Sequence, residues 1–130
     1  MMQLKMKNPE SYQIEILPRQ DILSYKVTGY VRTEHDFHQF IHDVNEIIKQ
    51  SIQKKVLADI RNLEGFRPDI FGAIRVVEEG FSRELWGRRI AIIEREENIG
   101  NMKQRETVAW NRGYSLKYFT SAKEAEAWLQ

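Results

Sequence analysis

Three histidines have the spacing of metal ligands on a helix. At ~100° per residue, His35, His38 and His42 fall within about 60° of one another, and Glu46 lies on the same side. His38 and His42 also have the i, i+4 spacing of helical metal ligands. The apolar stripe of the same helix points the opposite way, so the rings face solvent and lack neighbours that would orient them. We therefore expect no metal site.

A carboxylate, Asp59, lies inside the apolar run Val56–Leu63. The length and composition of this run are typical of a strand buried on both faces in the middle of a parallel sheet. A buried carboxylate must be hydrogen-bonded, paired or neutralised. Asp59 either meets a ligand at the end of a parallel strand, or accepts N–H groups of residues 63–66 or pairs with Arg61 or Arg67. We favour the second, structural interpretation.

The sequence contains none of the usual hydrolase or nucleotide-binding motifs. No serine lies in a Gly-x-Ser-x-Gly context, and there is no Walker-type loop or Gly-x-Gly-x-x-Gly motif. Since there is no cysteine, there is no thiolate nucleophile and no cysteine-bound zinc. The acidic groups Glu78-Glu79 and Glu94-Glu96-Glu97 are interpreted as solvated ends of a helix and a strand. We expect a protein that is not an enzyme and has no cofactor.

Large aromatic side chains gather around the second predicted helix, among several glycines. They are Phe66, Phe71, Phe81, Trp86 and Trp110. The preferred interpretation is core packing, because cores are rich in aromatic side chains. The alternative is an apolar pocket or an exposed patch that receives a ligand or a partner. For that alternative the candidate binding residues are Asp59, Phe66, Phe71, Phe81 and Trp86.

The composition is that of one soluble globular domain. The 130 residues can bury a core but are too few for two, so we expect a single domain over residues 1–130. Lys and Arg total 20 against 19 for Asp and Glu, and this dispersed, nearly neutral charge argues against a nucleic-acid partner. Met1 to Asn8 lacks a continuous apolar core, and no apolar run could span a bilayer. We expect a cytoplasmic protein without membrane insertion.

The hydrophobic periodicity predicts an α/β fold in which strands alternate with helices. The predicted strands are Tyr12–Leu17, Ile22–Val31, Val56–Leu63, Arg89–Arg95 and Leu116–Phe119. The first two form an antiparallel hairpin, and Gly29 inside the second indicates a bulge or a close backbone approach.

Four helices are predicted between and after these strands. The first is capped by Thr33 and buries Phe37, Phe40, Ile41, Val44, Ile47 and Ile48. The second starts at Pro68 and Asp69, and its apolar stripe is Ile70, Phe71, Ile74 and Val77. The third runs over Asn101–Asn111, and the last is capped by Ser121, with Glu124 three residues later. The segment Phe81–Gly87 is left unassigned. The order β-β-α-β-α-β-α-β-α predicts a mixed sheet with helical cover.

Three pieces of the chain carry a family resemblance: Val56–Leu63 with its carboxylate, Asn111–Gly113 before the last strand, and the ending Tyr118–Leu129. With the order of elements, they make the chain similar to STAS domains, named for sulfate transporters and anti-sigma-factor antagonists. Within that superfamily it resembles the SpoIIAA-like branch of small, stand-alone bacterial proteins. The resemblance covers nearly the whole chain from Tyr12 on. It implies the STAS fold, a cytoplasmic setting and a binding or regulatory role.

One departure from the family pattern concerns regulation. In anti-sigma-factor antagonists the loop after the central strand carries an Asp-Ser pair whose serine is phosphorylated. The corresponding stretch, Asn62–Asp69, contains neither Ser nor Thr. The phosphorylation switch is therefore not expected in this chain.

Two functions remain open. The first is a non-enzymatic regulatory or protein-interaction module of the STAS type. The second is a carrier or sensor of a small apolar ligand in a pocket near the second helix, by analogy with the lipid-carrying CRAL-TRIO fold, which is broadly similar to STAS. The expected partner is thus a protein or a small apolar ligand, and a homodimer is left open.

Overall fold

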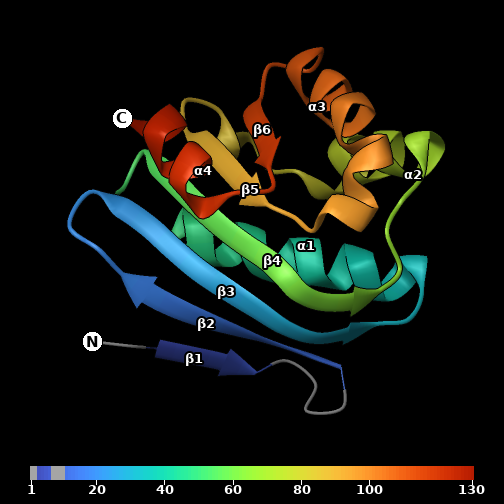
Figure 1. Cartoon of the computed structure of the whole chain (residues 1–130), viewed down its shortest axis with the longest axis horizontal. Helices are drawn as coiled ribbons and strands as arrows, with labels where there is room; N and C mark the ends of the chain where they lie inside the picture. The colour runs from blue at the N-terminus through green and yellow to red at the C-terminus, as the bar shows by residue number, and fades with distance from the viewer. Residues whose placement is uncertain (1–2, 7–10) are drawn as a thin grey trace.

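A mixed β-sheet forms the centre of the fold. The computed structural model describes residues 3–6 and 11–130. In these residues, six strands pair in the order in which they occur in the sequence (Figure 1). They are β1 (Gln3–Met6), β2 (Tyr12–Pro18), β3 (Ile22–Val31), β4 (Lys55–Gly65), β5 (Arg89–Ile93) and β6 (Ser115–Phe119). The strands β1 to β3 pair antiparallel, whereas β3 to β6 pair parallel. The predicted mixed sheet and the interior position of β4 are confirmed.

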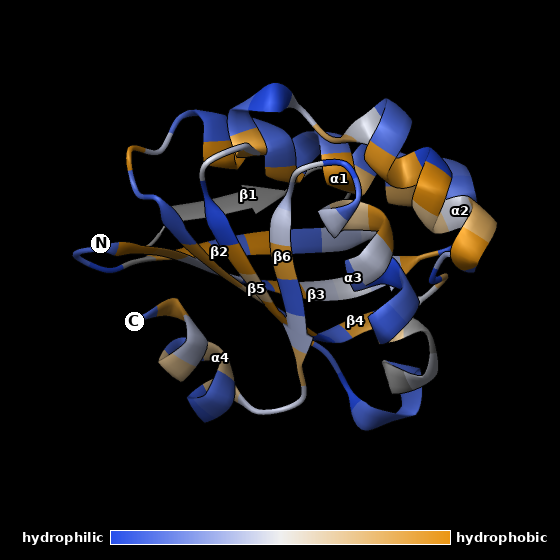
Figure 2. Ribbon diagram, turned by 90° about the horizontal axis from the view of Figure 1, so that it is seen from above, coloured by the Kyte–Doolittle hydropathy of each residue, from blue (hydrophilic) through white to orange (hydrophobic). Residues whose placement is uncertain are grey.

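Helices cover both faces of this sheet. They are α1 (Glu34–Lys49), α2 (Ile70–Arg75), the π-helix η1 (Val76–Gly80), the 3-10 helices η2 (Arg83–Leu85) and η3 (Glu96–Asn101), α3 (Met102–Trp110) and α4 (Ala122–Leu129). Val56 and Ala58 of β4 pack in one core with α1, η1 and α3, while Leu57 packs in a second core with α4. Figure 2 shows α4 across the sheet from α1. Since neighbouring residues of β4 enter opposite cores, its predicted burial on both faces is confirmed.

The hairpin of β2 and β3 depends on a close backbone approach at Gly29. Gly29 has a φ of +109°, and a Cβ there would lie 2.2 Å from the carbonyl oxygen of Ser11. The N–H of the next residue, Tyr30, donates to that same oxygen at 2.5 Å. Only glycine adopts this backbone conformation without steric cost. Of the two predictions for Gly29, the close approach is confirmed.

The first and last helices begin at the predicted caps. The N–H of Asp36 donates to the Thr33 hydroxyl at 3.1 Å, and the N–H of Glu124 donates to the Ser121 hydroxyl at 3.3 Å. Each cap satisfies an N–H group that has no partner within its helix.

The second helix differs from the prediction in its shape and in its buried face. After α2 the chain continues as η1, in which the N–H of Phe81 donates to the carbonyl of Val76 at 3.1 Å. This wider turn brings the adjacent Val76 and Val77 both onto the sheet side, where both are buried. Phe71 is 68% exposed, so its predicted place in the apolar stripe is wrong.

The helix α3 closes the free edge of the sheet along β6. The indole Nε1 of Trp110 donates to the carbonyl of Leu116 at 2.8 Å, and the Glu106 carboxylate accepts the N–H of Tyr118 at 2.7 Å. These side chains occupy backbone groups that would otherwise pair with another strand. The third predicted helix is confirmed with bounds one residue shorter at each end, since Asn101 belongs to η3 and Asn111 to the turn after α3.

The strand β1 at the opposite edge is not among the predicted strands. It pairs with β2 in a register that places Gln3 opposite Ile16. Within the residues described, no helix combines the length and the apolar character needed to cross a membrane.

Candidate functional site

The first candidate site is the region where β4 passes the carboxyl end of β5. Asp59 is in register with Ile93, the last residue of β5. On the other side of β4, the pairing with β3 is irregular. Lys26 pairs with Asp59 and Thr28 pairs with Asn62, so β4 has one more residue than β3 between these two pairs. Such β-bulges often re-aim side chains near binding sites. The contacts of Asp59 therefore decide what this region can do.

Asp59 pairs with a residue of its own strand. Its carboxylate accepts hydrogen bonds from the backbone N–H of Arg61 at 3.1 Å, from Nε at 3.0 Å and from Nη2 at 2.8 Å. Burial raises the pKa of the Asp59 carboxyl, but the hydrogen bonds and charge of Arg61 outweigh burial, so the net pKa is lowered. Of the structural alternatives predicted for Asp59, the pairing with Arg61 is the one found among the described residues. No contact of Asp59 with the N–H groups of residues 63–66 or with Arg67 is found there. A binding role for Asp59 stays a prediction.

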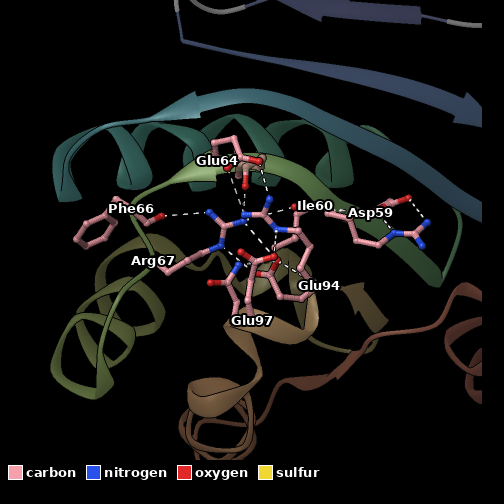
Figure 3. A network of polar contacts seen from close by, with 11 residues as sticks. Asp59, Ile60, Glu64, Phe66, Arg67, Glu94 and Glu97 are labelled. Atoms are coloured by element: carbon pink, nitrogen blue, oxygen red, sulfur yellow. Dashed lines mark hydrogen bonds and ion pairs between the residues drawn. The ribbon is translucent and has the colours of Figure 1, made fainter.

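A buried ion pair, Arg67 with Glu94, fastens the loop that leaves β4 (Figure 3). Arg67 Nε donates to Glu94 Oε2 at 2.8 Å, and its Nη2 donates to the carbonyl of Leu63 at 2.6 Å. Its Nη1 donates to the carbonyl of Phe66 at 3.3 Å. The guanidinium of Arg67 therefore donates to backbone carbonyls of the loop, while the carboxylate of Glu94 balances its charge.

The prediction that Glu94 is solvated is wrong. Its side chain is fully buried, and it also accepts the N–H of Arg95 at 3.0 Å and the Asn98 side-chain amide at 3.2 Å. At the rim, Arg95 pairs with Glu64 at 2.6 Å. Each of these charged side chains is paired with an opposite charge. A general base or nucleophile must instead be free to contact a substrate, so these groups are not held as catalytic groups. We therefore interpret this cluster as structural, and call the residues Arg67, Glu94, Arg95 and Glu64 together the Arg67 clasp.

The candidate aromatic residues do not form one cluster. Phe66 packs edge-on against Phe37 of α1 at 5.9 Å between ring centroids, and Phe81 packs edge-on against Tyr114 at 5.1 Å. Trp86 lies 6.0 Å from the same Tyr114 ring but is 48% exposed. Core packing thus accounts for Phe66 and Phe81, whereas Phe71 and Trp86 present apolar surface to solvent.

Trp86 and Trp110 flank one turn, between α3 and β6. Trp86 Nε1 lies 3.6 Å from the position of a Cβ at Gly113, and the N–H of Gly113 donates to the carbonyl of Trp110 at 3.0 Å. Trp110 is 55% exposed although its indole N–H is bonded to β6. We refer to these two exposed tryptophans and Gly113 of the turn between them together as the aromatic edge.

The second candidate site is an apolar cavity of about 80 Å³ between the sheet and the helices α1, η1 and α3. Its lining is almost entirely aliphatic and aromatic, and includes Phe40, Val44, Ala58, Val77, Phe81 and Ile90. Part of its wall is the π-helix η1, and π-turns are frequent at functional sites. A pocket near the second helix is thus present, and Phe81 is the predicted binding residue that lines it.

Two polar side chains from different helices also line the cavity. Asn45 of α1 donates through Nδ2 to the carbonyl of Gly80, and Arg105 of α3 lies over the Tyr118 ring with 5.7 Å between the guanidinium carbon and the ring centroid. Burial raises the pKa of Tyr25 and Tyr118, which line the same cavity, so both hydroxyls stay protonated. Arg105 is absent from the predicted site. The helical spacing of Met102, Arg105 and Ala109, which puts Arg105 on the apolar side of α3, is the signal that could have found it.

None of the histidines of α1 belongs to the lining of this cavity or to the ion pairs of the clasp. His38 is 3.7 Å from Glu34, while His35 and His42 are exposed. Within residues 3–6 and 11–130, no three His, Asp or Glu side chains converge in a way that could hold a metal ion.

Comparisons with known proteins agree with this architecture. A protein of the DUF3478 family with a SpoIIAA-like fold from Shewanella loihica PV-4 is 20% identical, with a TM-score of 0.54 over 97% of this chain and 99% of that chain. An anti-sigma factor antagonist from Mycobacterium paratuberculosis is 12% identical, with a TM-score of 0.50 over 95% and 98% of the two chains. These likenesses establish the fold. No curated protein matches the sequence. The family model described as SpoIIAA-like matches residues 22–130, and the chain therefore belongs to the SpoIIAA-like family.

Proposed function

We propose that this protein is a non-enzymatic regulatory module of the STAS type, which works through contacts with a protein partner. Membership of the SpoIIAA-like family supports a regulatory role. The pairing of charges in the Arg67 clasp supports a structural rather than a catalytic role for that region, because each charge is already bound to another.

The observation that carries the proposal is the aromatic edge. Tryptophan is enriched among residues that dominate binding energy at protein interfaces, and exposed apolar surface next to polar groups is typical of such interfaces. Arg83 lies over the Trp86 ring at 5.7 Å and adds a cation at the rim of this surface. The aromatic edge could thus supply both an apolar centre and a charged rim.

The proposed module lacks the phosphorylation switch of anti-sigma-factor antagonists. The stretch that would carry the phosphorylated serine, Asn62–Asp69, has no Ser or Thr. Arg67, in the same stretch, is tied to Glu94 and to backbone carbonyls, which favours a loop of fixed conformation. Regulation would then depend on the amount or occupancy of the protein rather than on phosphorylation of this loop.

Affinity capture with matched baits tests the proposal. The wild-type chain, a Trp86→Ser/Trp110→Ser variant and a Tyr30→Ser variant are used to capture proteins from a lysate of the source organism. Tyr30 is the control, since it is 48% exposed like Trp86 but lies near the end of β3, as its penultimate residue. We expect a partner that wild type and Tyr30→Ser retain and that the double variant loses. Recovery of the same proteins by all three baits would refute the role of the aromatic edge. Self-association stays a prediction that light scattering tests.

The cavity favours a second candidate function, the binding of a small apolar ligand. Native mass spectrometry of freshly purified protein would detect a co-purifying molecule as a discrete mass increase. The absence of any such species, together with no binding of added small apolar molecules, would remove this candidate.

A further inference from the structure

A buried cation without a counter-ion lies at the apolar cavity. Arg105 is only 6% exposed, and its Nε has no hydrogen-bond partner in the part of the chain that the structure describes. None of the ion pairs formed by those residues includes Arg105, and the fully buried Glu94 is already paired with Arg67. A buried charge is costly unless it is paired and hydrogen-bonded. The Nε–H group of Arg105 therefore remains available to an anion, while the rest of the guanidinium lies against Tyr118.

A second unsatisfied polar atom belongs to the same cavity. The amide of Asn45 is oriented by its bond to the carbonyl of Gly80, and this leaves its Oδ1 buried without a partner among the described residues. Core packing alone does not explain two such side chains, because buried polar groups are normally hydrogen-bonded. Both belong to the lining of the cavity, whose other members are mainly apolar.

We infer that the cavity binds a small carboxylate with an apolar body, its carboxylate paired with the guanidinium of Arg105. This inference rests on the second candidate function and names the class of ligand. Arginine suits this role because its planar donors match a carboxylate in a two-bond geometry. The aliphatic and aromatic walls take the apolar body, while the charge of the ligand balances that of Arg105.

The volume of the cavity limits the size of the ligand. A cavity of ~150 Å³ is known to accommodate benzene. By proportion, about 80 Å³ accommodates an apolar body of roughly three to four non-hydrogen atoms. Butanoate, with three carbons beyond its carboxylate, is the matching probe.

Nuclear magnetic resonance titration of the full chain tests this inference with three probes of equal length: butanoate, butan-1-ol and butylamine. The side-chain Nε–H signal of Arg105 reports the ion pair, and backbone signals of α1, η1 and α3 report filling of the cavity. We expect butanoate to bind at least tenfold more tightly than the other two probes and to shift the Arg105 signal. We expect an equal concentration of chloride to leave that signal in place.

Two variants separate the charge of Arg105 from the apolar walls. Arg105→Met keeps the length of the side chain without its charge, and should weaken butanoate binding at least tenfold while leaving butan-1-ol binding unchanged. Lys103→Met removes an exposed positive charge from the same helix and should change neither. Equal binding of butanoate and butan-1-ol to wild type, or an equal shift with chloride, would overturn the carboxylate inference but not the apolar-ligand function. Failure of all three probes to bind would overturn the inference and count against that function as well.

Discussion

Replacing Glu94 with glutamine is expected to destabilise the fold by about 3 kcal/mol, the lower end of the range for breaking a buried ion pair. The nearest charged atoms of Arg67 and Glu94 are 2.8 Å apart. At an effective dielectric constant of ~20, their attraction is about 6 kcal/mol. A neutral amide costs less to bury than a carboxylate, which offsets part of that loss. The carbonyl of Leu63 continues to accept from Arg67, which limits the loss further.

The geometry of the amide adds a second cost. Glu94 receives donors at both oxygens, from Arg67, the N–H of Arg95 and Asn98. Glutamine has a single acceptor oxygen, so its NH₂ group must face donors. Glu64→Gln is the matched control, because Glu64 pairs with Arg95 at the same edge but is 53% exposed. For this exposed pair we expect a loss below about 1 kcal/mol.

Urea unfolding followed by tryptophan fluorescence measures both variants. We expect Glu94→Gln to lower the unfolding free energy by at least about 2 kcal/mol more than Glu64→Gln, since only the first leaves a buried cation unpaired. Equal losses in the two variants would show that the Arg67 clasp is not a buried, interdependent structure.

Three further substitutions test other features. Ser121→Ala should lower the unfolding free energy by about 1 kcal/mol through loss of the N-cap, and an unchanged urea midpoint would place the cap elsewhere. Asp59→Asn should cost roughly 1–3 kcal/mol at neutral pH. Because the pKa of Asp59 is lowered from its ordinary 3.8, its contribution is complete above that ordinary value and is lost as pH falls through the folded pKa. The gap between wild type and Asp59→Asn should therefore close in acid, and a gap that persists there would contradict the ionised pairing. Gly29→Ala should cost at least about 2 kcal/mol, because its Cβ meets the Ser11 carbonyl in a left-handed conformation, whereas Gly100→Ala has open space and serves as the thermal-denaturation control.

The parts of the fold that the sequence predicts are those in which one residue pattern has one low-energy outcome. The face of α1 follows from its helical spacing, and Thr33 and Ser121 cap because their hydroxyls lie three residues before an unpaired N–H. The continuous apolar run of β4 has no polar face to expose, so it lies inside the sheet.

The features that escape prediction depend on partners distant in sequence. Glu94 ends a strand beside other acidic residues, and only the fold brings Arg67 to it from 27 positions away. The shift from α2 to η1 depends on packing of Val76 and Val77 against the sheet, which local spacing does not encode. The strand β1 is stabilised by pairing with β2 rather than by its own short sequence.

The aromatic residues show the same division. Phe71 and Phe81 look alike in sequence, yet Phe81 packs on Tyr114 while Phe71 faces solvent. The burial of Arg105, in contrast, could have been predicted, since its helical spacing from Met102 and Ala109 places it on the apolar face of α3.

Hydrogen exchange at the aromatic edge shows directly whether the protein acts through a protein partner docked on these residues. Exchange is measured on the chain alone and on its complex with the protein that wild-type bait retains and Trp86→Ser/Trp110→Ser bait loses. We expect exchange at least tenfold slower in the complex for the amides of η2 and of residues 110–115, with the β2–β3 hairpin unchanged. Protection confined to the hairpin or to α4, with residues 110–115 exchanging as in the free chain, would contradict it.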